Sequence, residues 1–335
     1  WNDGNGPNSG HVRIYENIGG SWSQIGQDID GEAAGDGSGY SVSLSSDGAI
    51  VAVGASANDG NGSNSGHVRI YENIGGSWSQ IGQDIDGENS GDYSGWSVSL
   101  SSDGSTVVIG APDNDGNGTS SGHVRIYENI GGVWTQIGQD IDGEAAYDNS
   151  GWSVSLSSDG STVAIGAEGN NGNGNNSGHV RIYENIGGSW SQIGQDIDGE
   201  VAGDYSGGSV SLSSDGITVA IGAYTNAGNG SLSGHVRVYE NLSGIWSQIS
   251  QDIDGEGAGD YSGGSVSLSS DGITVAIGAY TNDGNGSQAG HVRIHSNLSS
   301  CPCYDTILTV TACDSFYWDG TTYDSTGIYT NIYSS

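Results

Sequence analysis

Short runs in which apolar and polar residues alternate recur along this 335-residue chain, and no stretch has the three- to four-residue spacing of an amphipathic helix. In the run that begins at His11, Val12 and Ile14 point to one side of an extended strand, whereas Arg13 and Tyr15 share the other side with the histidine. Glycine, asparagine, aspartate and serine separate this run from the next. The pattern predicts an all-β fold built from short strands.

The runs form a repeat with a period of 56 residues, measured from one "GHVR" histidine to the next. Each copy contains "SVSL", a run such as "TVAIGA", then "HVRIYEN" and "SWSQIG", and it closes with "QDIDGE". These runs predict four antiparallel strands per repeat. One histidine marks each copy of the third strand: His11, His67, His123, His179, His235 and His291.

A four-stranded sheet of this size cannot cover both of its faces by itself, so the copies must pack face to face. Radial packing also protects the sheet edges, and it predicts a β-propeller with one blade per repeat over residues 1–297, with six or seven blades. The chain begins in the middle of a blade, so we expect it to be an excerpt of a longer protein.

The run "GDYSGWSVSLSSDGSTVVIGAPDNDGNGTSSGHVRIYEN" (91–129) resembles the FG-GAP repeats of integrin-α-type propellers, in particular the shorter bacterial variety. The resemblance implies a ring of seven blades. This chain departs from the family pattern, because Ser-Gly replaces Phe-Gly and the Pro of Gly-Ala-Pro occurs only at Pro112. The calcium loop between the first two strands of such blades is here only "SSDG", so that calcium site is not expected.

Residues 298–335 leave the repeat and predict a second, β-rich unit with a hairpin turn at Asp319 and Gly320. The phrase "ACDSFYWDGTTYDSTGIYT" is similar to modules of long secreted surface proteins of Bacteroidetes. That resemblance implies export by the type IX route and an extracellular or cell-surface location on a bacterium.

All three cysteines, Cys301, Cys303 and Cys313, lie in this last segment. In an extracellular chain, Cys313 would form a disulfide with Cys301 or Cys303, and the remaining thiol would pair outside the sequence. A zinc site is the alternative.

The charge balance limits the partners. The chain has 62 glycines and a net charge of −34, and its only six cationic side chains of the Lys and Arg type are the arginines of the repeated strand. A surface this negative repels phosphate backbones and anionic membranes, so nucleic-acid binding is not expected. No apolar stretch approaches the roughly 20 residues that span a bilayer, so membrane insertion is not expected.

Divalent cations are the natural counter-ions of such a chain, and the repeated "QDIDGE" segment carries the densest set of oxygen ligands. The sequence predicts calcium at these positions, with solvated acidic turns as the alternative. The candidate ligands are Asp28, Asp30, Glu32, Asp36, Asp84, Asp86, Glu88, Asp92, Asp140, Asp142, Glu144, Asp148, Asp196, Asp198, Glu200, Asp204, Asp252, Asp254, Glu256 and Asp260.

The repeated arginines are predicted to be structural, each pairing with a carboxylate of its own or the neighbouring blade. They are Arg13, Arg69, Arg125, Arg181, Arg237 and Arg293. The repeated histidines are predicted to hydrogen-bond a backbone group or a carboxylate. Near-identical copies give every histidine the same environment, whereas catalysis needs groups in different environments, so no enzyme is expected.

These features predict a non-enzymatic adhesion or structural module of a long surface protein. Its partners would be other cells, surface glycans or proteins, or sister subunits in a homo-oligomer or fibre. A carbohydrate-binding propeller is the alternative, because Trp96 and Trp152 occupy a position where other copies have Tyr40, Gly208 and Gly264.

Overall fold

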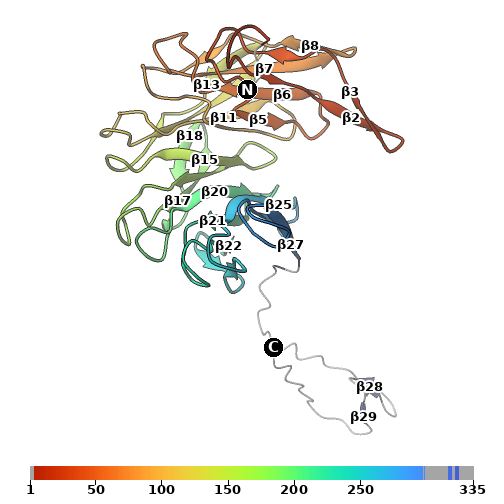
Figure 1. Ribbon diagram of the computed structural model, residues 1–335, viewed down its shortest axis with the longest axis vertical. Coiled ribbons are helices and arrows are strands. Elements are labelled where there is room, and N and C mark those ends of the chain that lie inside the picture. The colour runs from red at the N-terminus through yellow and green to blue at the C-terminus, as the bar shows by residue number, and fades with distance from the viewer. Residues whose placement is uncertain (1–3, 297, 299–315, 319–320, 324–335) are drawn as a thin grey trace. The chain divides into compact units, whose positions relative to one another are not determined.

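The computed structural model describes residues 4–296, 298, 316–318 and 321–323 of the chain, and all elements in this part are strands. The chain divides into two units, Trp1–Ser299 and Ser300–Ser335. The predicted all-β propeller architecture is confirmed: in the first unit, antiparallel sheets with four strands in sequence order follow one another from β5–β8 to β20–β23, and the three-stranded sheet β25–β27 comes after them (Figure 1). No described element is a helix able to cross a membrane.

Four blades contain a full set of strands. The first has β5 (Ser41–Leu44), β6 (Ile50–Ala55), β7 (His67–Ile74), β8 (Ser77–Gln80) and β9 (Ile85–Asp86). The second has β10 (Ser97–Leu100), β11 (Thr106–Ala111), β12 (His123–Ile130), β13 (Val133–Gln136) and β14 (Ile141–Asp142). The third has β15 (Ser150–Leu156), β16 (Thr162–Ala167), β17 (His179–Ile186), β18 (Ser189–Gln192) and β19 (Ile197–Asp198). The fourth has β20 (Ser206–Leu212), β21 (Thr218–Ala223), β22 (His235–Asn241), β23 (Trp246–Gln248) and β24 (Ile253–Asp254).

Partial blades flank these four. Before them lie β1 (His11–Val12), β2 (Tyr15–Ile18), β3 (Ser21–Gln24) and β4 (Ile29–Asp30), and after them β25 (Ser262–Leu268), β26 (Thr274–Ala279) and β27 (His291–Ser296). The second unit contributes an antiparallel pair, β28 (Phe316–Trp318) and β29 (Thr321–Tyr323). The turn between these two strands and all three cysteines lie outside the described residues.

The structure adds a fifth short strand to the four predicted per repeat. In the first complete blade, β9 pairs with the first two residues of β7, while β8 pairs with the other half of the same strand. The "QDID" segment is therefore partly strand, not only a loop. The pairing sets Asp86 opposite His67 and brings Asp84 close to the same histidine.

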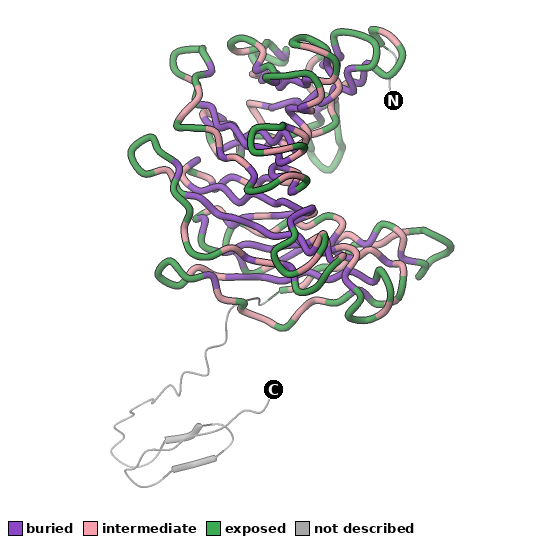
Figure 2. The backbone as a smooth tube through the Cα atoms, turned by 90° about the vertical axis from the view of Figure 1, so that its left-hand side faces the viewer, coloured by how far each residue is buried: buried purple, intermediate pink, exposed green. Residues whose placement is uncertain are grey.

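The hydrophobic core lies between blades. Val68 and Ile70 from one blade pack in a single cluster with Ile109, Tyr127 and Trp134 of the next blade, and the same set recurs along the series. The opposite face of the third strand is buried as well, because a second blade covers it. Figure 2 shows that most of the buried backbone lies in the middle of the stack of blades and that most connecting loops are exposed. The alternating pattern in the sequence, which predicts one buried face per strand, therefore understates the burial.

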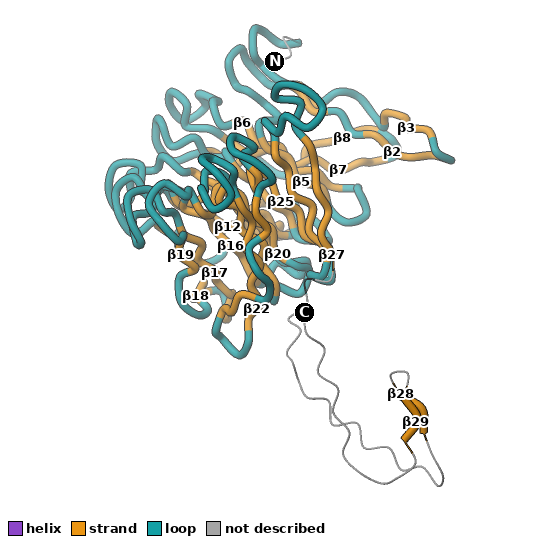
Figure 3. Tube along the Cα trace, turned by 60° about the horizontal axis from the view of Figure 1, so that its bottom comes forward, coloured by secondary structure: helices purple, strands orange, loops and turns teal. Residues whose placement is uncertain are grey.

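Polar contacts join the blades at two radii. Near the outer edge, the indole Nε1 of Trp190 donates to the carbonyl of Ile137 in the preceding blade at 3.0 Å. Near the inner edge, the backbone amide of Leu156 donates to Ser99 Oγ of the preceding blade at 3.1 Å. Figure 3 shows the strands of neighbouring blades side by side. Each blade is thus aligned with its predecessor by both packing and hydrogen bonds.

The tryptophans at this position form a comparison within the chain. Trp190 is 3% exposed against the blade before it, whereas Trp22, which has no such blade in this chain, is 70% exposed. The two tryptophans have the same neighbours in the repeated sequence, and they differ in whether a preceding blade is present. Burial of the repeat therefore depends on its neighbour.

We expect Trp190→Ala to lower the unfolding free energy by about 3 to 5 kcal/mol, because it removes a buried indole and leaves a cavity between two blades. The change is measured as the midpoint of chemical denaturation followed by circular dichroism. Trp22→Ala is the matched control and should cost less than about 0.5 kcal/mol, as an exposed substitution does. Equal losses in the two variants would show that packing between blades does not hold the fold together.

Candidate functional site

The copies carry side chains of different chemical types at two positions: near the start of the first strand of a blade and just after the second strand. Antiparallel pairing of the two strands brings these positions together. The first strands are the innermost, since β5, β10, β15, β20 and β25 each contact the next in the series. One end of the inner strands therefore carries residues that differ from blade to blade. At the end of the second strand these residues are Ser56, Pro112, Glu168, Tyr224 and Tyr280.

Aromatic rings cover this end in two runs. The first run is Tyr40, Trp96 and Trp152, with ring centroids 4.6 Å and 4.8 Å apart, and Tyr93 meets Trp96 edge-on. The structure thus brings the two predicted ligand-binding tryptophans into contact. The second run is Tyr205, Tyr224, Tyr261 and Tyr280, with centroids 5.3 to 6.4 Å apart. We call these eight residues the inner-rim surface.

Unusual backbone conformations support part of this surface. Tyr93, Tyr205 and Tyr261 have φ angles of 52° to 54°, in the left-handed region that non-glycine residues rarely adopt. The corresponding position of the first complete blade is Gly37, which tolerates the same conformation. Non-glycine residues in this region cost free energy and concentrate at functional sites.

A cavity of about 370 Å³ lies beside the first aromatic run. Tyr40, Tyr93 and Trp96 form its aromatic wall, and Gly37 and Ser56 lie on its lining. The cavity is large enough for a small ring compound, and such pockets are typically apolar with a few polar groups.

Glu168 is the one carboxyl group among the residues at the ends of the second strands. It belongs to the third blade and accepts a hydrogen bond at Oε2 from the hydroxyl of Tyr224, in the fourth blade, at 3.1 Å. Only 6% of Glu168 is exposed. Burial raises the pKa of this carboxyl from its ordinary value of 4.5 to about 7, and the hydrogen bond from Tyr224 lowers it only in part.

Gly208 leaves room for the ring of Tyr224 beside Glu168. A Cβ at this position would lie 2.5 Å from Tyr224 Cε1 and 3.1 Å from Glu168 Oε2. The second and third blades carry Trp96 and Trp152 at the same position, and a tryptophan here would fill the space. The sequence analysis does not single out Glu168. The signal is present, because a lone acid stands at a position that is otherwise Ser, Pro or Tyr, but it emerges only when the copies are aligned.

The acidic residues predicted to bind calcium have separate partners. In the first segment, Asp28 accepts from the side chain of Gln24, and Asp36 accepts from the backbone amide of Ala33. The backbone carbonyl of Asp30 accepts from Arg69, while Glu32 lies near Arg69 and His67. The carboxylates of Asp28 and Asp30 come together with His11, whereas Glu32 and Asp36 have these other partners, so the four side chains do not form one cluster and calcium binding stays a prediction.

The arginines link successive blades. Arg69 Nη2 donates to the carbonyl of Asp30 at 2.8 Å, and its Nη1 lies 3.5 Å from Glu32 Oε1, both in the preceding blade. The geometry is one carbonyl and one carboxylate rather than a bidentate pair. Arg13 has no preceding blade in this chain, and its Nε and Nη2 instead donate to Asp28.

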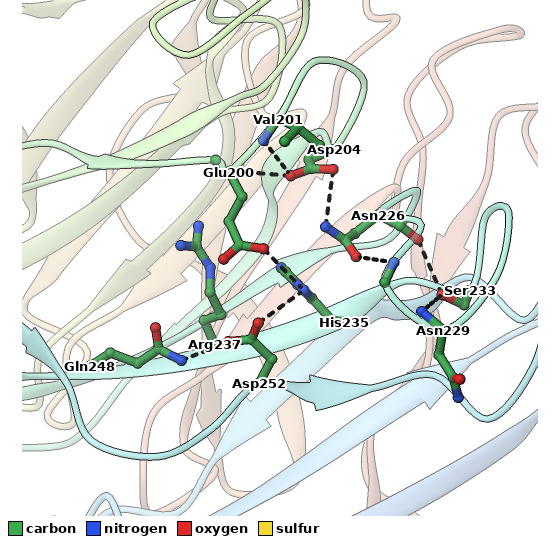
Figure 4. Close-up of polar contacts among 12 residues, drawn as sticks. Glu200, Val201, Asp204, Asn226, Asn229, Ser233, His235, Arg237, Gln248 and Asp252 are labelled. Atoms are coloured by element: carbon green, nitrogen blue, oxygen red, sulfur yellow. Dashed lines mark hydrogen bonds and ion pairs between the residues drawn. The ribbon is translucent and has the colours of Figure 1, made fainter.

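The repeated histidines are buried beside carboxylates. His235 Nδ1 lies 3.9 Å from both Glu200 Oε2 and Asp252 Oδ2 (Figure 4), too far for the predicted hydrogen bond. Burial, and then the arginine two residues along the strand, lower the pKa of His123 and His179 to about 4. These imidazoles are therefore neutral at physiological pH.

Comparison with known proteins agrees with the architecture. The model of the FG-GAP repeat matches residues 29–71, 85–127 and 141–183, which supports the predicted resemblance to a repeat propeller. Among curated proteins, none matches the sequence.

Two solved structures resemble the chain. The periplasmic gluconolactonase PpgL of Pseudomonas aeruginosa has 18% sequence identity and a TM-score of 0.52, over 79% of this chain and 70% of the other. A putative 6-phosphogluconolactonase from Bacteroides uniformis ATCC 8492 has 11% identity and a TM-score of 0.46, over 83% of this chain and 84% of the other.

The first of these similarities corrects the functional prediction. The sequence predicts a non-enzymatic adhesion or structural module, or else a carbohydrate-binding propeller, yet the solved propeller that this chain resembles is that of a lactonase. The inference from this architecture to a non-enzymatic role is therefore wrong. At 18% identity the likeness establishes the fold of a repeat β-propeller, and any activity depends on this chain's own side chains.

Proposed function

We propose that the inner-rim surface, together with Glu168 beside its Tyr224, is the active site of a hydrolase, with Glu168 as the general acid and base. The observation that carries this proposal is the buried carboxyl of Glu168, whose hydrogen bond to Tyr224 joins two blades and whose pKa burial raises to about 7. A catalytic acid or base works best when its pKa is near the operating pH, because both protonation states are then accessible. Burial brings a glutamate into this range, which an exposed glutamate does not reach.

The repeated histidines are expected to be non-catalytic because all copies share one environment, and this reason does not apply to Glu168. Those side chains occur in every copy in nearly the same surroundings, so none is set apart for a separate role. Glu168 occurs once, its partner Tyr224 comes from the next blade, and both fit beside the fourth blade because it has Gly208, where a Cβ would clash with Tyr224. This group of three makes one position in the series chemically distinct.

The substrate class follows from the aromatic runs on either side. Flat aromatic faces bind the apolar faces of sugar-like rings, while hydroxyl groups at the rim of a ring find polar partners. The enzyme that this fold resembles is named a gluconolactonase. We therefore assign a sugar lactone, a cyclic ester with several hydroxyl groups, as the substrate class.

In this reaction the carboxylate of Glu168 takes a proton from a water molecule as the water oxygen bonds to the lactone carbonyl carbon. The ring C–O ester bond then breaks, and the proton returns from Glu168 to the departing alkoxide oxygen. The product is the open hydroxy acid, and the glutamate is again ionised. The Tyr224 hydroxyl orients the carboxylate and limits the rise of its pKa.

We expect the chain to hydrolyse glucono-δ-lactone faster than the buffer blank, and Glu168→Gln to lower kcat by about 100-fold or more, because the amide cannot accept a proton. Acid release is followed in a pH-stat between pH 5 and 8. Tyr224→Phe should move the midpoint of the pH–rate profile upward, because it removes the hydrogen bond that lowers the pKa of Glu168.

The matched control is Glu184→Gln, which removes an exposed carboxylate from β17 of the same blade and should leave the rate unchanged. Hydrolysis no faster than the blank, or equal rates for the wild-type chain and Glu168→Gln, would refute the proposal.

The raised pKa also predicts how stability depends on pH. The folded state holds the proton of Glu168 more tightly than the unfolded state, so its contribution is lost as pH rises from about 4.5 to about 7. Glu168→Gln removes this penalty and should raise the unfolding free energy at pH 8 by about 2 to 3 kcal/mol, with little effect at pH 4. Urea unfolding at both pH values measures the difference.

Glu184→Gln again serves as the control, because an exposed carboxylate should not change the pH dependence. A gain in Glu168→Gln that is the same at pH 4 and pH 8 would mean that the carboxyl is not held protonated by burial.

A further inference from the structure

The clusters of Glu, His and Asp between blades have no role in the proposed active site. Each complete cluster takes its glutamate from one blade and its histidine and aspartate from the next, with the candidate ligand atoms within 4.8 Å of one another. Among the described residues there are four such sets: Glu32, His67 and Asp84; Glu88, His123 and Asp140; Glu144, His179 and Asp196; and Glu200, His235 and Asp252.

The fourth cluster shows the arrangement most plainly. Glu200 and Asp252 approach the same imidazole nitrogen of His235, each at 3.9 Å (Figure 4). Two ligands of one metal ion at about 2.1 Å lie about 3.4 Å apart at the tetrahedral angle. A shift of a few tenths of an ångström would therefore admit an ion, and Glu200, whose side chain is 43% exposed, can supply that shift.

The histidine itself is an independent sign of a missing partner. His235 is 1% exposed, and its Nδ1 faces the two carboxylates without a hydrogen bond to any described residue. His67 is equally buried, and its Nδ1 lies 3.9 Å from Glu32 Oε2. A buried polar group without a hydrogen-bond partner is costly, and an ion bound at Nδ1 would supply that partner.

The geometry points to a divalent transition-metal site in each of the four clusters, for which zinc is the natural ion. Each site offers one imidazole nitrogen and two carboxylate oxygens, and the exposed side of the glutamate leaves room for water as a further ligand. Calcium prefers six to eight oxygens and has no affinity for nitrogen comparable to that of zinc. This donor set therefore favours zinc over the calcium predicted from the acidic segment alone.

The neighbouring arginine leaves the site free. In the second cluster Arg125 Nη1 lies 3.6 Å from Glu88 Oε1, while Glu88 Oε2 faces His123. One oxygen thus serves the arginine and the other serves the metal. Because the glutamate belongs to the preceding blade, a bound ion would link two blades at the radius of the third strand.

We expect titration calorimetry with zinc chloride on the full chain, with its cysteines alkylated and in phosphate-free buffer at pH 7, to give about four ions per chain. Asp140→Asn preserves the shape of the side chain but weakens one cluster, so the stoichiometry should fall to about three. Asp84→Asn and Asp196→Asn repeat the test at separate sites, so that poor folding of one variant does not decide the outcome. Zinc should also raise the thermal midpoint of the wild-type chain.

Glu128→Gln is the control, since it removes an exposed carboxylate from the same strand as His123 and should keep the wild-type stoichiometry. The absence of zinc binding, or a stoichiometry that none of the aspartate variants lowers, would overturn the sites and leave a bridging water as the occupant. Calcium binding with the same stoichiometry and the same loss in Asp140→Asn would overturn the assignment of the metal. None of these measurements uses lactone hydrolysis, so they stand apart from the activity of Glu168.

Discussion

The structure depends on one constraint: each sheet has two apolar faces, and only another blade can cover them. The third strand meets this constraint directly, because its valine and isoleucine pack on the following blade while its histidine, arginine and tyrosine are buried against the preceding one. The first copies of these residues show the consequence. Arg13 turns to a carboxylate of its own blade, and Trp22 lies in solvent, although both have the same sequence surroundings as their buried counterparts.

The features of the fold that repeat along the chain can be predicted from the sequence. The 56-residue spacing and the alternation in "HVRIY" are enough to predict strands, blades and packing between copies. They are not enough to predict β9, because a pairing of two residues leaves no alternation to detect. Nor do they predict that His67 is buried on the polar side of its strand, since a period of two cannot distinguish a face in water from a face against another blade.

The candidate site was harder to predict for a different reason. Repetition draws attention to what every copy shares, whereas Glu168 is important because one copy departs from the rest. Its pKa depends on burial and on Tyr224, which lies 56 residues away in the sequence and belongs to the adjacent blade. The irregular tryptophans could be noted from the alignment of copies, but the burial of a single carboxyl between two blades requires coordinates.

Packing between blades also explains why the repeated glutamates and Glu168 have different electrostatic surroundings. Where the copies are identical, a carboxylate between blades meets the same arginine each time, and this cation offsets part of the cost of burying the negative charge. Where the copies differ, Glu168 meets a tyrosine and no cation among the groups that shift its pKa, so burial acts against its charge without compensation. All six arginines lie in the repeated strand, so a carboxyl at a position that the repeat does not share has no arginine assigned to it by the pattern, and burial then decides the direction of its pKa shift.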